Sequence, residues 1–126
     1  MIKGTGIDIV EIDRFNDAVA KWGDSFLGKI FTKEEIRYSS KRRFSGQHFA
    51  ARFAAKEAIM KAFGDDLGQI KKWTDIEIKN VANGKPVVEL YKSAKKLKTV
   101  KHISDIMISM SHSHKYAIAH AVLISE

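Results

Sequence analysis

The sequence predicts an α+β fold in which an antiparallel sheet packs against one long, alanine-rich helix. Three features support this fold class: residues 2–11 are rich in β-branched side chains, residues 45–63 are rich in alanine, and two alternating segments flank a polar turn at residues 113–115. A chain of 126 residues suits one compact core and leaves no room for a second. We therefore expect residues 1–126 to form a single domain.

The first segment predicts a strand and then a helix. The strand ends near Glu11, and Asp13 is expected to cap the helix, because aspartate accepts hydrogen bonds from the free N–H groups at a helix start. The helix should run to about Trp22 and stop at Gly23, since glycine tolerates the left-handed conformation that ends many helices. Phe15 and Trp22 then share one face at helical spacing.

Residues 24–43 predict two short helices. The first covers residues 24–30. The second begins after Thr32, because Thr32 and Glu35 have the spacing of a capping box, in which each side chain bonds the backbone of the other residue. This helix is expected to end in the basic stretch 41–43.

The segment 45–63 is the clearest predicted element. Alanine has the highest helix propensity, and Gly64 provides an end signal. Small side chains also allow a neighbouring backbone to approach closely. The alanines concerned are Ala50, Ala51, Ala54, Ala55, Ala58 and Ala62.

The C-terminal half predicts strands and one further helix. Asn83, Gly84, Lys85 and Pro86 form a turn, because Asn-Gly accepts positive φ and proline restrains the exit. The expected elements around it are a strand over 73–79, a strand over 87–90, a basic amphipathic helix over 91–100, and a terminal hairpin of strands 105–111 and 116–124.

The chain is strongly basic, with a formal net charge of +7 and a pI of about 9.6. Such a surplus favours an anionic partner. Charge alone leaves nucleic acid, an anionic membrane, a phosphorylated ligand and an acidic protein as open alternatives.

Several classes of protein are disfavoured by composition. No apolar run approaches the roughly 20 residues that a membrane-spanning helix needs, and the N-terminus lacks the pattern of a signal peptide. We therefore expect a cytoplasmic protein with no membrane partner. The chain has no cysteine, which excludes disulfides, thiolate metal sites and thiol nucleophiles.

Asp8 and Glu57 are the first candidates for a functional site. Asp8 lies between two isoleucines in the first strand, where it either protects a strand edge or binds a cation. Glu57 shares a helix face with Lys61, and an exposed pair of this kind contributes only about 0.3 kcal/mol. The flanking residues are alanine and phenylalanine, however, and charged groups are costly to bury without partners. Two carboxylates from separate elements suit Mg²⁺, which keeps several waters and binds substrate phosphates.

A histidine cluster near the C-terminus offers a second candidate. Its members are His102, His112, His114 and His120. Zinc is one alternative, but their spacing fits no standard zinc pattern. His112 follows Ser111 at a strand end, and we interpret it as a donor to phosphate.

Three segments together resemble one known family. Gly6–Arg14 (GIDIVEIDR), Arg52–Gly64 (RFAAKEAIMKAFG) and Ser109–Val122 (SMSHSHKYAIAHAV) are similar to segments of the holo-acyl-carrier-protein synthases. The turn Asn83–Pro86 (NGKP) falls where that family has a similar turn. The order and spacing agree along essentially the whole chain, and the length is typical of the short, trimeric group of these enzymes.

This resemblance implies both a fold and a reaction. It implies a 4′-phosphopantetheinyl transferase-like fold and a Mg²⁺-dependent enzyme that moves 4′-phosphopantetheine from coenzyme A to a serine of apo-acyl carrier protein. The second product would be adenosine 3′,5′-bisphosphate, and the reaction would support fatty acid biosynthesis. Family members of this length resemble homotrimers with sites between subunits.

The resemblance also implies residue roles. Asp8 and Glu57 are the expected Mg²⁺ ligands, and together with Lys61, beside the coenzyme A diphosphate, they form the expected catalytic group. The base that accepts the serine proton is either Glu57 or a metal-bound water. Phe53 and Met60 stand at positions where members of the family vary, and they are expected not to touch this chemistry.

Further contacts are expected with the two substrates. Arg14 is implied as a contact to the acidic carrier protein, and Lys21 and Lys29 near the first helix are expected to help steer that protein. Coenzyme A contacts are expected from Arg52, Asn83, Gly84, Lys85, Pro86, Ser111 and His112, with Arg42 and Arg43 as candidates for its 3′-phosphate.

Two rival interpretations explain less. A nucleic-acid-binding module would use the basic charge and the lysine-rich segment 91–101, but it gives no reason for Asp8 and Glu57, so we expect no nucleic acid partner. A non-catalytic binder of coenzyme A or carrier protein could share the fold. The intact set of Asp8, Glu57 and Lys61 argues against that second rival.

Overall fold

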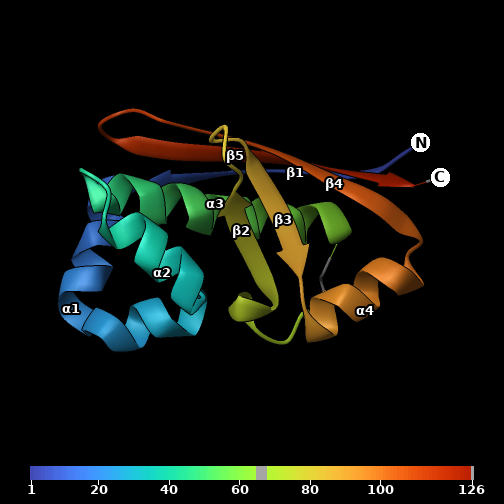
Figure 1. Ribbon diagram of the computed structural model, residues 1–126, viewed down its shortest axis with the longest axis horizontal. Coiled ribbons are helices and arrows are strands. Elements are labelled where there is room, and N and C mark those ends of the chain that lie inside the picture. The colour runs from blue at the N-terminus through green and yellow to red at the C-terminus, as the bar shows by residue number, and fades with distance from the viewer. Residues whose placement is uncertain (65–67, 126) are drawn as a thin grey trace.

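The computed structural model describes residues 1–64 and 68–125, and it has helices packed on one face of a three-stranded sheet (Figure 1). The sheet has the spatial order β1 (Ile2–Glu11), β5 (Tyr116–Ser125), β4 (Ile103–His112), with antiparallel pairing throughout. A second antiparallel pair consists of β2 (Ile76–Asn80) and β3 (Pro86–Leu90). The expected α+β fold is confirmed, and so is the terminal hairpin of β4 and β5.

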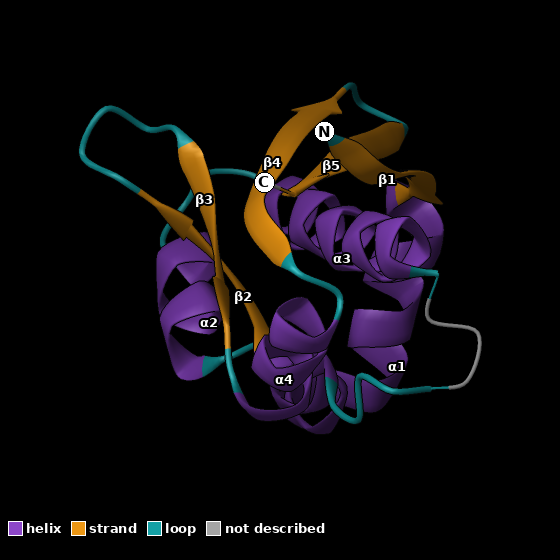
Figure 2. Cartoon of the chain, turned by 90° about the vertical axis from the view of Figure 1, so that its right-hand side faces the viewer, coloured by secondary structure: helices purple, strands orange, loops and turns teal. Residues whose placement is uncertain are grey.

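The helices are α1 (Ile12–Ile30), α2 (Lys33–Ser40), α3 (Ser45–Phe63) and α4 (Lys92–Val100), with a short 3₁₀ turn, η1 (Trp73–Asp75). Figure 2 shows α3 beneath the three-stranded sheet and the β2–β3 pair as a separate ribbon beside it. Helix α3 has the predicted bounds and ends at Gly64, whose φ is 64°. It forms the centre of the molecule, because both hydrophobic clusters of the core include its side chains.

Strand β1 lies unusually close to α3 because it carries Gly4 and Gly6. A Cβ atom at Gly4 would overlap the carbonyl oxygen of Ala62, and one at Gly6 would overlap the carbonyl oxygen of Ala58. Glycine in the strand and alanine in the helix therefore let the two backbones touch. Because side chains alternate along a strand, Asp8 lies on the same face of β1 as these glycines and projects toward α3.

The predicted capping box at the start of α2 is confirmed, since Thr32 and Glu35 bond each other's backbone N–H groups. The Glu35 carboxylate is also fully buried and forms an ion pair with Lys56 Nζ on α3 at 2.6 Å. Lys56 Nζ donates to the carbonyl oxygen of Ile30 at 2.7 Å, and Glu35 accepts from the backbone N–H of Ile78 at 2.9 Å. One buried ion pair thus joins α1, α2, α3 and β2.

The start of α1 differs from the prediction for Asp13. The helix begins at Ile12, so Glu11 occupies the N-cap position and its side chain makes no capping hydrogen bond. The backbone N–H of Ile12 donates instead to the carbonyl oxygen of Lys115 in the β4–β5 turn, at 2.8 Å. A tertiary contact therefore takes over part of the role predicted for Asp13, whose charge still favours the helix N-terminus.

Gly23 interrupts α1 as predicted, with φ of 63° and ψ of −145°, and the chain then resumes a helix to Ile30. The predicted apolar face is correct for Phe15, which is buried, and wrong for Trp22, which is 59% exposed. The break at Gly23 turns the chain at this point, so Trp22 stays at the surface and the Lys21 ammonium lies 4.9 Å from its ring centroid.

The predicted strand over 73–79 is partly wrong, because its first three residues form η1 and pairing begins at Ile76. The Asp75 side chain is buried and accepts a hydrogen bond from the Ser93 hydroxyl. The Asp75 carbonyl oxygen accepts from the backbone N–H of Tyr91 at 2.8 Å. These contacts with the start of α4 favour a tight turn over an extended chain.

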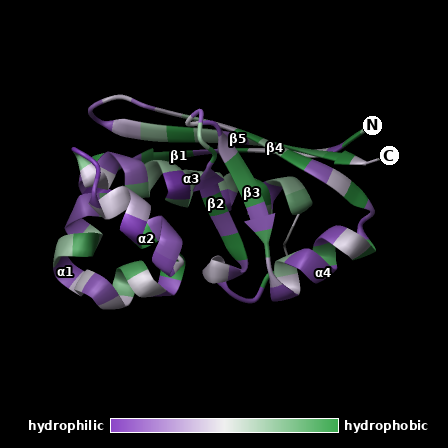
Figure 3. Ribbon diagram, viewed as in Figure 1, coloured by the Kyte–Doolittle hydropathy of each residue, from purple (hydrophilic) through white to green (hydrophobic). Residues whose placement is uncertain are grey.

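The outer face of the three-stranded sheet has no described helix over it, although its strands carry hydrophobic bands (Figures 1 and 3). Ile7 is 58% exposed, Ile9 61%, Met107 54% and Ile118 38%. Large apolar side chains exposed on one sheet face are a feature of interaction surfaces.

Within the described residues, no helix combines the length and apolar character that crossing a membrane requires.

Candidate active site

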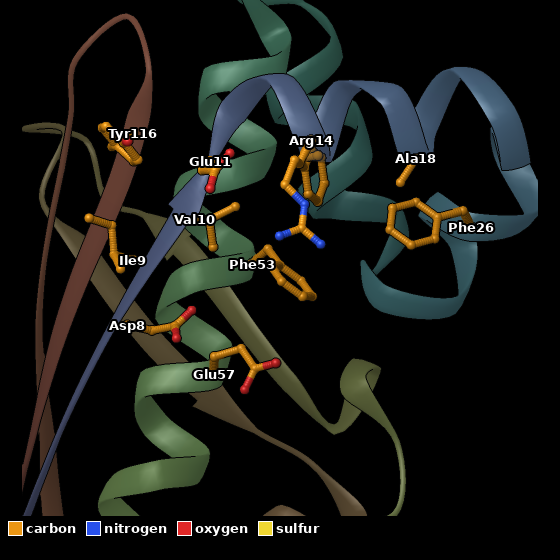
Figure 4. Close-up of a pocket in the computed structure, with 11 residues that line it drawn as sticks. Asp8, Ile9, Val10, Glu11, Arg14, Ala18, Phe26, Phe53, Glu57 and Tyr116 are labelled. Atoms are coloured by element: carbon orange, nitrogen blue, oxygen red, sulfur yellow. The ribbon is translucent and has the colours of Figure 1, made fainter.

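Asp8 and Glu57 come together at the contact between β1 and α3. Figure 4 shows their carboxyl groups side by side, one projecting from the strand and the other from the helix. The close approach made possible by Gly6 and Ala58 sets this arrangement, since Asp8 follows the glycine on the same face and Glu57 precedes the alanine. The two predicted metal ligands therefore meet within one subunit.

Lys61 joins this pair from the next turn of α3. Its Nζ lies 2.9 Å from Asp8 Oδ1 and donates to the carbonyl oxygen of Ile7 at 3.2 Å. The Lys61 side chain is 54% exposed, whereas that of Asp8 is 16% exposed. The cation therefore balances Asp8 from the solvent side, and most of its surface stays accessible to an anion.

Burial raises the pKa of Glu57, the nearby Asp8 carboxylate raises it further, and Lys61 partly opposes the rise. Two carboxylates at close range repel each other when both are ionised. A proton or a cation between them relieves that repulsion. Glu57 is thus suited to share a divalent ion with Asp8, and without an ion it holds a proton more readily than an isolated glutamate does.

The donor set fits Mg²⁺ and does not fit a cage built only from protein side chains. The described residues contain no group of three or more His, Cys, Asp or Glu side chains that could surround a metal. Mg²⁺ commonly binds one or two carboxylates and completes its shell with water and substrate phosphate. Asp8 and Glu57 are the residues that would hold it.

A cleft of about 470 Å³ extends from the carboxylate pair along α1. Its polar rim includes Glu11 and Arg14, and its floor is aromatic. Phe15, Phe26 and Phe53 form this floor, and the Phe15 ring centroid lies 5.8 Å from that of Phe26 and 5.6 Å from that of Phe53. Phe53, which was expected not to touch the chemistry, lines the same cleft as Glu57.

A second cleft, of about 510 Å³, lies on another side of α3, between that helix, β4 and the turn after β2. It gathers Arg52, Gly84, Lys85, Pro86 and His112, all of which were predicted to contact coenzyme A. The other polar residues that line this cleft are Tyr38, His48, Asn80 and Ser109. They come from four different segments, so no periodic pattern in the sequence could have indicated that they lie together.

Arg52 is the central cation of this second cleft but is only 2% exposed. Its guanidinium stacks on Tyr38 at 4.4 Å from the ring centroid and donates to Asn80 Oδ1. Asn80 Nδ2 donates in turn to the carbonyl oxygen of Gly84 at 2.9 Å. Arg52 therefore holds the turn in place, and its charge acts on the cleft from below the surface.

The other predicted coenzyme A contacts lie at or beyond the edge of this cleft. Arg42, like Arg52, stacks on Tyr38, with its guanidinium 4.1 Å from the ring centroid. Arg43 is exposed and stacks on Phe44 at 5.1 Å. Asn83 accepts from the backbone N–H of Lys85 at 2.9 Å and shapes the turn. Ser111 is one residue before His112 on β4, so its side chain lies on the opposite face of the sheet.

The three predicted carrier-protein contacts separate into two groups. Arg14 lines the first cleft, as Glu57 does. Lys21 and Lys29 are exposed on α1 but do not line that cleft. Their positions suit long-range attraction of an acidic protein surface, and not contact with a protein at the first cleft itself.

No residue lines both clefts. Arg52 and Glu57 are five positions apart on α3, so they lie roughly 140° apart around the helix axis. The predicted residues therefore form two sets, the carboxylates at the first cleft and the basic side chains at the second. Within one chain the two sets remain apart.

Comparisons with known proteins match the chain over almost its full length. Residues 4–121 match the family model of the 4′-phosphopantetheinyl transferase superfamily. The chain is 43% identical over 123 residues to the holo-[acyl-carrier-protein] synthase of Syntrophus aciditrophicus (strain SB), covering 98% of this chain and 96% of the relative.

Solved structures agree with that match. The holo-[acyl-carrier-protein] synthase from Neisseria meningitidis superposes with a TM-score of 0.91 at 33% identity, covering 99% of this chain and 100% of the other. A holo-(acyl-carrier-protein) synthase from Bacillus anthracis str. Ames, in complex with CoA (3′,5′-ADP), gives a TM-score of 0.81 at 33% identity, covering 100% of this chain and 99% of that chain.

Proposed function

Because the chain belongs to the 4′-phosphopantetheinyl transferase superfamily, and is an enzyme of its holo-[acyl-carrier-protein] synthase type, we propose that it transfers the 4′-phosphopantetheine arm of coenzyme A to a serine of apo-acyl carrier protein. The products would be holo-acyl carrier protein and adenosine 3′,5′-bisphosphate. The meeting of Asp8 and Glu57 at one cleft, with Lys61 paired to Asp8, carries the proposal.

The transfer is a substitution at phosphorus. The serine oxygen bonds to the phosphorus that carries pantetheine, the bridging P–O bond breaks, and its electron pair leaves with adenosine 3′,5′-bisphosphate. Glu57 is the candidate within this chain for accepting the serine proton in this scheme, with a metal-bound water as the alternative. Lys61 stabilises the leaving group, since an ammonium acts most strongly where negative charge develops.

Asp8 and Glu57 would hold Mg²⁺ through their carboxylate oxygens. When bound, the ion neutralises charge on the diphosphate oxygens and orients them for in-line attack. Asp8 has a second task, because it orients Lys61 through the 2.9 Å ion pair. Coenzyme A as the donor is further supported by a related structure from Helicobacter pylori in complex with coenzyme A.

The second cleft would bind the nucleotide part of coenzyme A. Lys85, His112 and the buried charge of Arg52 offer complementary groups to phosphate, and Arg42 extends this basic surface. Arg14 would contact the acidic carrier protein at the rim of the first cleft, and Lys21 and Lys29 would raise the rate of encounter.

We further propose that residues 1–126 act as one transferase domain in a cytoplasmic homotrimer. The two clefts lie apart within a chain, so a complete site needs the first cleft of one subunit to face the second cleft of its neighbour. The uncovered apolar face of the three-stranded sheet supports such an assembly.

The direct test is incubation of the protein with apo-acyl carrier protein, coenzyme A and Mg²⁺, followed by intact-mass measurement of the carrier. The expected result is a carrier heavier by one phosphopantetheine group, with no change when the metal is chelated. An unmodified carrier, with coenzyme A and Mg²⁺ in excess, would contradict the proposal.

A further inference from the structure

His48 stands beside the second cleft without a role in the proposed reaction. It lies on α3, one turn before Arg52. Its ring centroid is 5.9 Å from that of His112 on β4 and 6.5 Å from that of Tyr38 on α2. His48 therefore sits where three elements meet, and its half-buried ring lines the same cleft as Lys85.

The residues around His48 are mostly basic. They are Arg52 on its own helix, Arg42 after α2, His112 on β4 and Lys85 in the turn, together with Tyr38 on α2. No carboxylate lines this cleft among the described residues. Burial lowers the pKa of His48, and Arg52, His112 and Arg42 lower it further. The cleft therefore concentrates positive charge that an anion would balance.

A phosphate group is the anion that this arrangement suits. Phosphate offers several acceptor oxygens, and charge-assisted donors of imidazolium, ammonium and guanidinium type bind it most strongly. We infer that His48 is a further phosphate ligand of the coenzyme A site, and that it binds as an imidazolium after taking up a proton together with the ligand. This inference rests on the proposed function, because coenzyme A is the source of the phosphate.

A measurable pH dependence follows from this proton uptake. The phosphate charge opposes the effect of Arg52 and Arg42, so the pKa of His48 is higher in the complex than in the free protein. Affinity should then fall as pH rises from 6.5 to 8.5, because the proton becomes harder to supply. A phosphate monoester, with a second pKa of about 6, is already mostly dianionic above pH 7, so its own titration does not cause this loss.

The test is calorimetric binding of coenzyme A at pH 6.5, 7.5 and 8.5. The variants are His48→Phe, which keeps a ring for packing, and His48→Gln, which keeps a hydrogen bond without a titratable group. The matched control is His102→Asn, because His102 lies outside both clefts and its positive φ of 57° is tolerated by asparagine. Thermal melts of each variant establish that the fold is kept.

We expect the affinity of the unsubstituted protein to fall about tenfold over this pH range, as one charge-assisted hydrogen bond is lost. Both His48 variants should bind about tenfold more weakly at pH 6.5 and approach the unsubstituted protein at pH 8.5. Dephospho-coenzyme A identifies the group concerned: a flat profile assigns His48 to the 3′-phosphate, and a persistent slope assigns it to the diphosphate.

An unchanged pH profile in both His48 variants would overturn the inference and leave the proposed function intact. Absence of coenzyme A binding by the unsubstituted protein at every pH would overturn both. A loss of slope in His102→Asn equal to that in the His48 variants would also contradict the assignment, since the effect would then not be specific to the cleft.

Discussion

At the scale of single residues, Asp8 has the greatest effect on the chemistry of the site. It contributes one of two neighbouring carboxylates, and it holds Lys61 through the 2.9 Å ion pair. Its position inside a strand would be unfavourable for a residue without partners. The proposed metal ligand and the partner that orients Lys61 are therefore the same side chain.

Replacing Asp8 with asparagine should reduce metal-dependent transfer at least about 100-fold, because a carboxylate ligand is lost and Lys61 loses its partner. Intact-mass assays give the rate, and Mg²⁺ titration calorimetry gives the affinity for the metal. Glu89→Gln removes a charge from an exposed site on β3 and serves as the control. Near-normal turnover in the Asp8→Asn variant would remove the metal assignment.

Ionised Glu57 should lower the free energy of unfolding at neutral pH, because burial and the Asp8 carboxylate both disfavour its charge and so raise its pKa. The folded protein binds this proton more tightly than the unfolded chain does, so the contribution of Glu57 to stability falls as pH rises above the ordinary value of 4.5.

Without metal, Glu57→Gln should therefore raise Tm at pH 7 by about 1–4 °C. The gain should disappear below the ordinary pKa of 4.5, where both states carry the proton. Differential scanning calorimetry at pH 7 and pH 4 measures both values, with Glu89→Gln as the reference. A lower Tm at pH 7 would show that Glu57 stabilises the fold.

At the scale of elements, the packing of β1 on α3 creates the site. Gly6→Ala should destabilise the protein by about 2–3 kcal/mol or more, because the new methyl group would collide with helix backbone that cannot move aside. Transfer activity should fall with it, since Asp8 follows on the same strand. Urea unfolding measures the free-energy change.

Gly28→Ala is the matched control for that substitution. A Cβ atom at Gly28, within α1, would meet no atom within 4 Å. Alanine there should leave stability unchanged or raise it by about 0.5 kcal/mol through helix propensity. Equal effects at the two positions would argue that close strand–helix contact is unimportant.

The buried Lys56–Glu35 pair is the second determinant at this scale. Burial lowers the pKa of Lys56, and Glu35 opposes that effect. Lys56→Met should cost about 3–5 kcal/mol, because it leaves the Glu35 charge buried without its partner. Lys95→Met, at an exposed position on α4, should be nearly neutral. A small loss in the Lys56→Met variant would mean that solvent or a proton compensates Glu35.

At the scale of the whole molecule, the proposed assembly would bring the two clefts together in one site. Met107→Lys places a charge on the uncovered sheet face and should convert the proposed trimer to a monomer of 14.2 kDa, with loss of transfer. Light scattering after gel filtration measures the mass. Val100→Lys substitutes another exposed apolar residue, 62% exposed on α4, and should keep both assembly and activity.

If the unsubstituted protein is a monomer that transfers at full rate, the shared-site proposal fails. If Met107→Lys gives an active monomer, the two clefts must act without a neighbouring subunit. Either result leaves the roles of Asp8 and Glu57 open to their own tests.

Local chemistry along the chain was enough to predict the element types, the capping box at Thr32 and the candidates Asp8, Glu57 and Lys61. These depend on periodicity, on end signals and on charged residues in apolar surroundings, all of which are visible within a few neighbouring positions. The same local rules failed at Trp22 and at residues 73–75, where Gly23 and the contacts of Asp75 with the start of α4 outweigh the pattern.

The folded arrangement was needed to establish that Asp8 reaches Glu57, that Phe53 lines their cleft, and that His48 faces His112. These contacts join segments far apart in sequence, and no local pattern specifies which faces of two elements will meet. That choice was made by packing, above all by the glycines of β1 against the alanines of α3, since only backbones without intervening side chains can approach so closely.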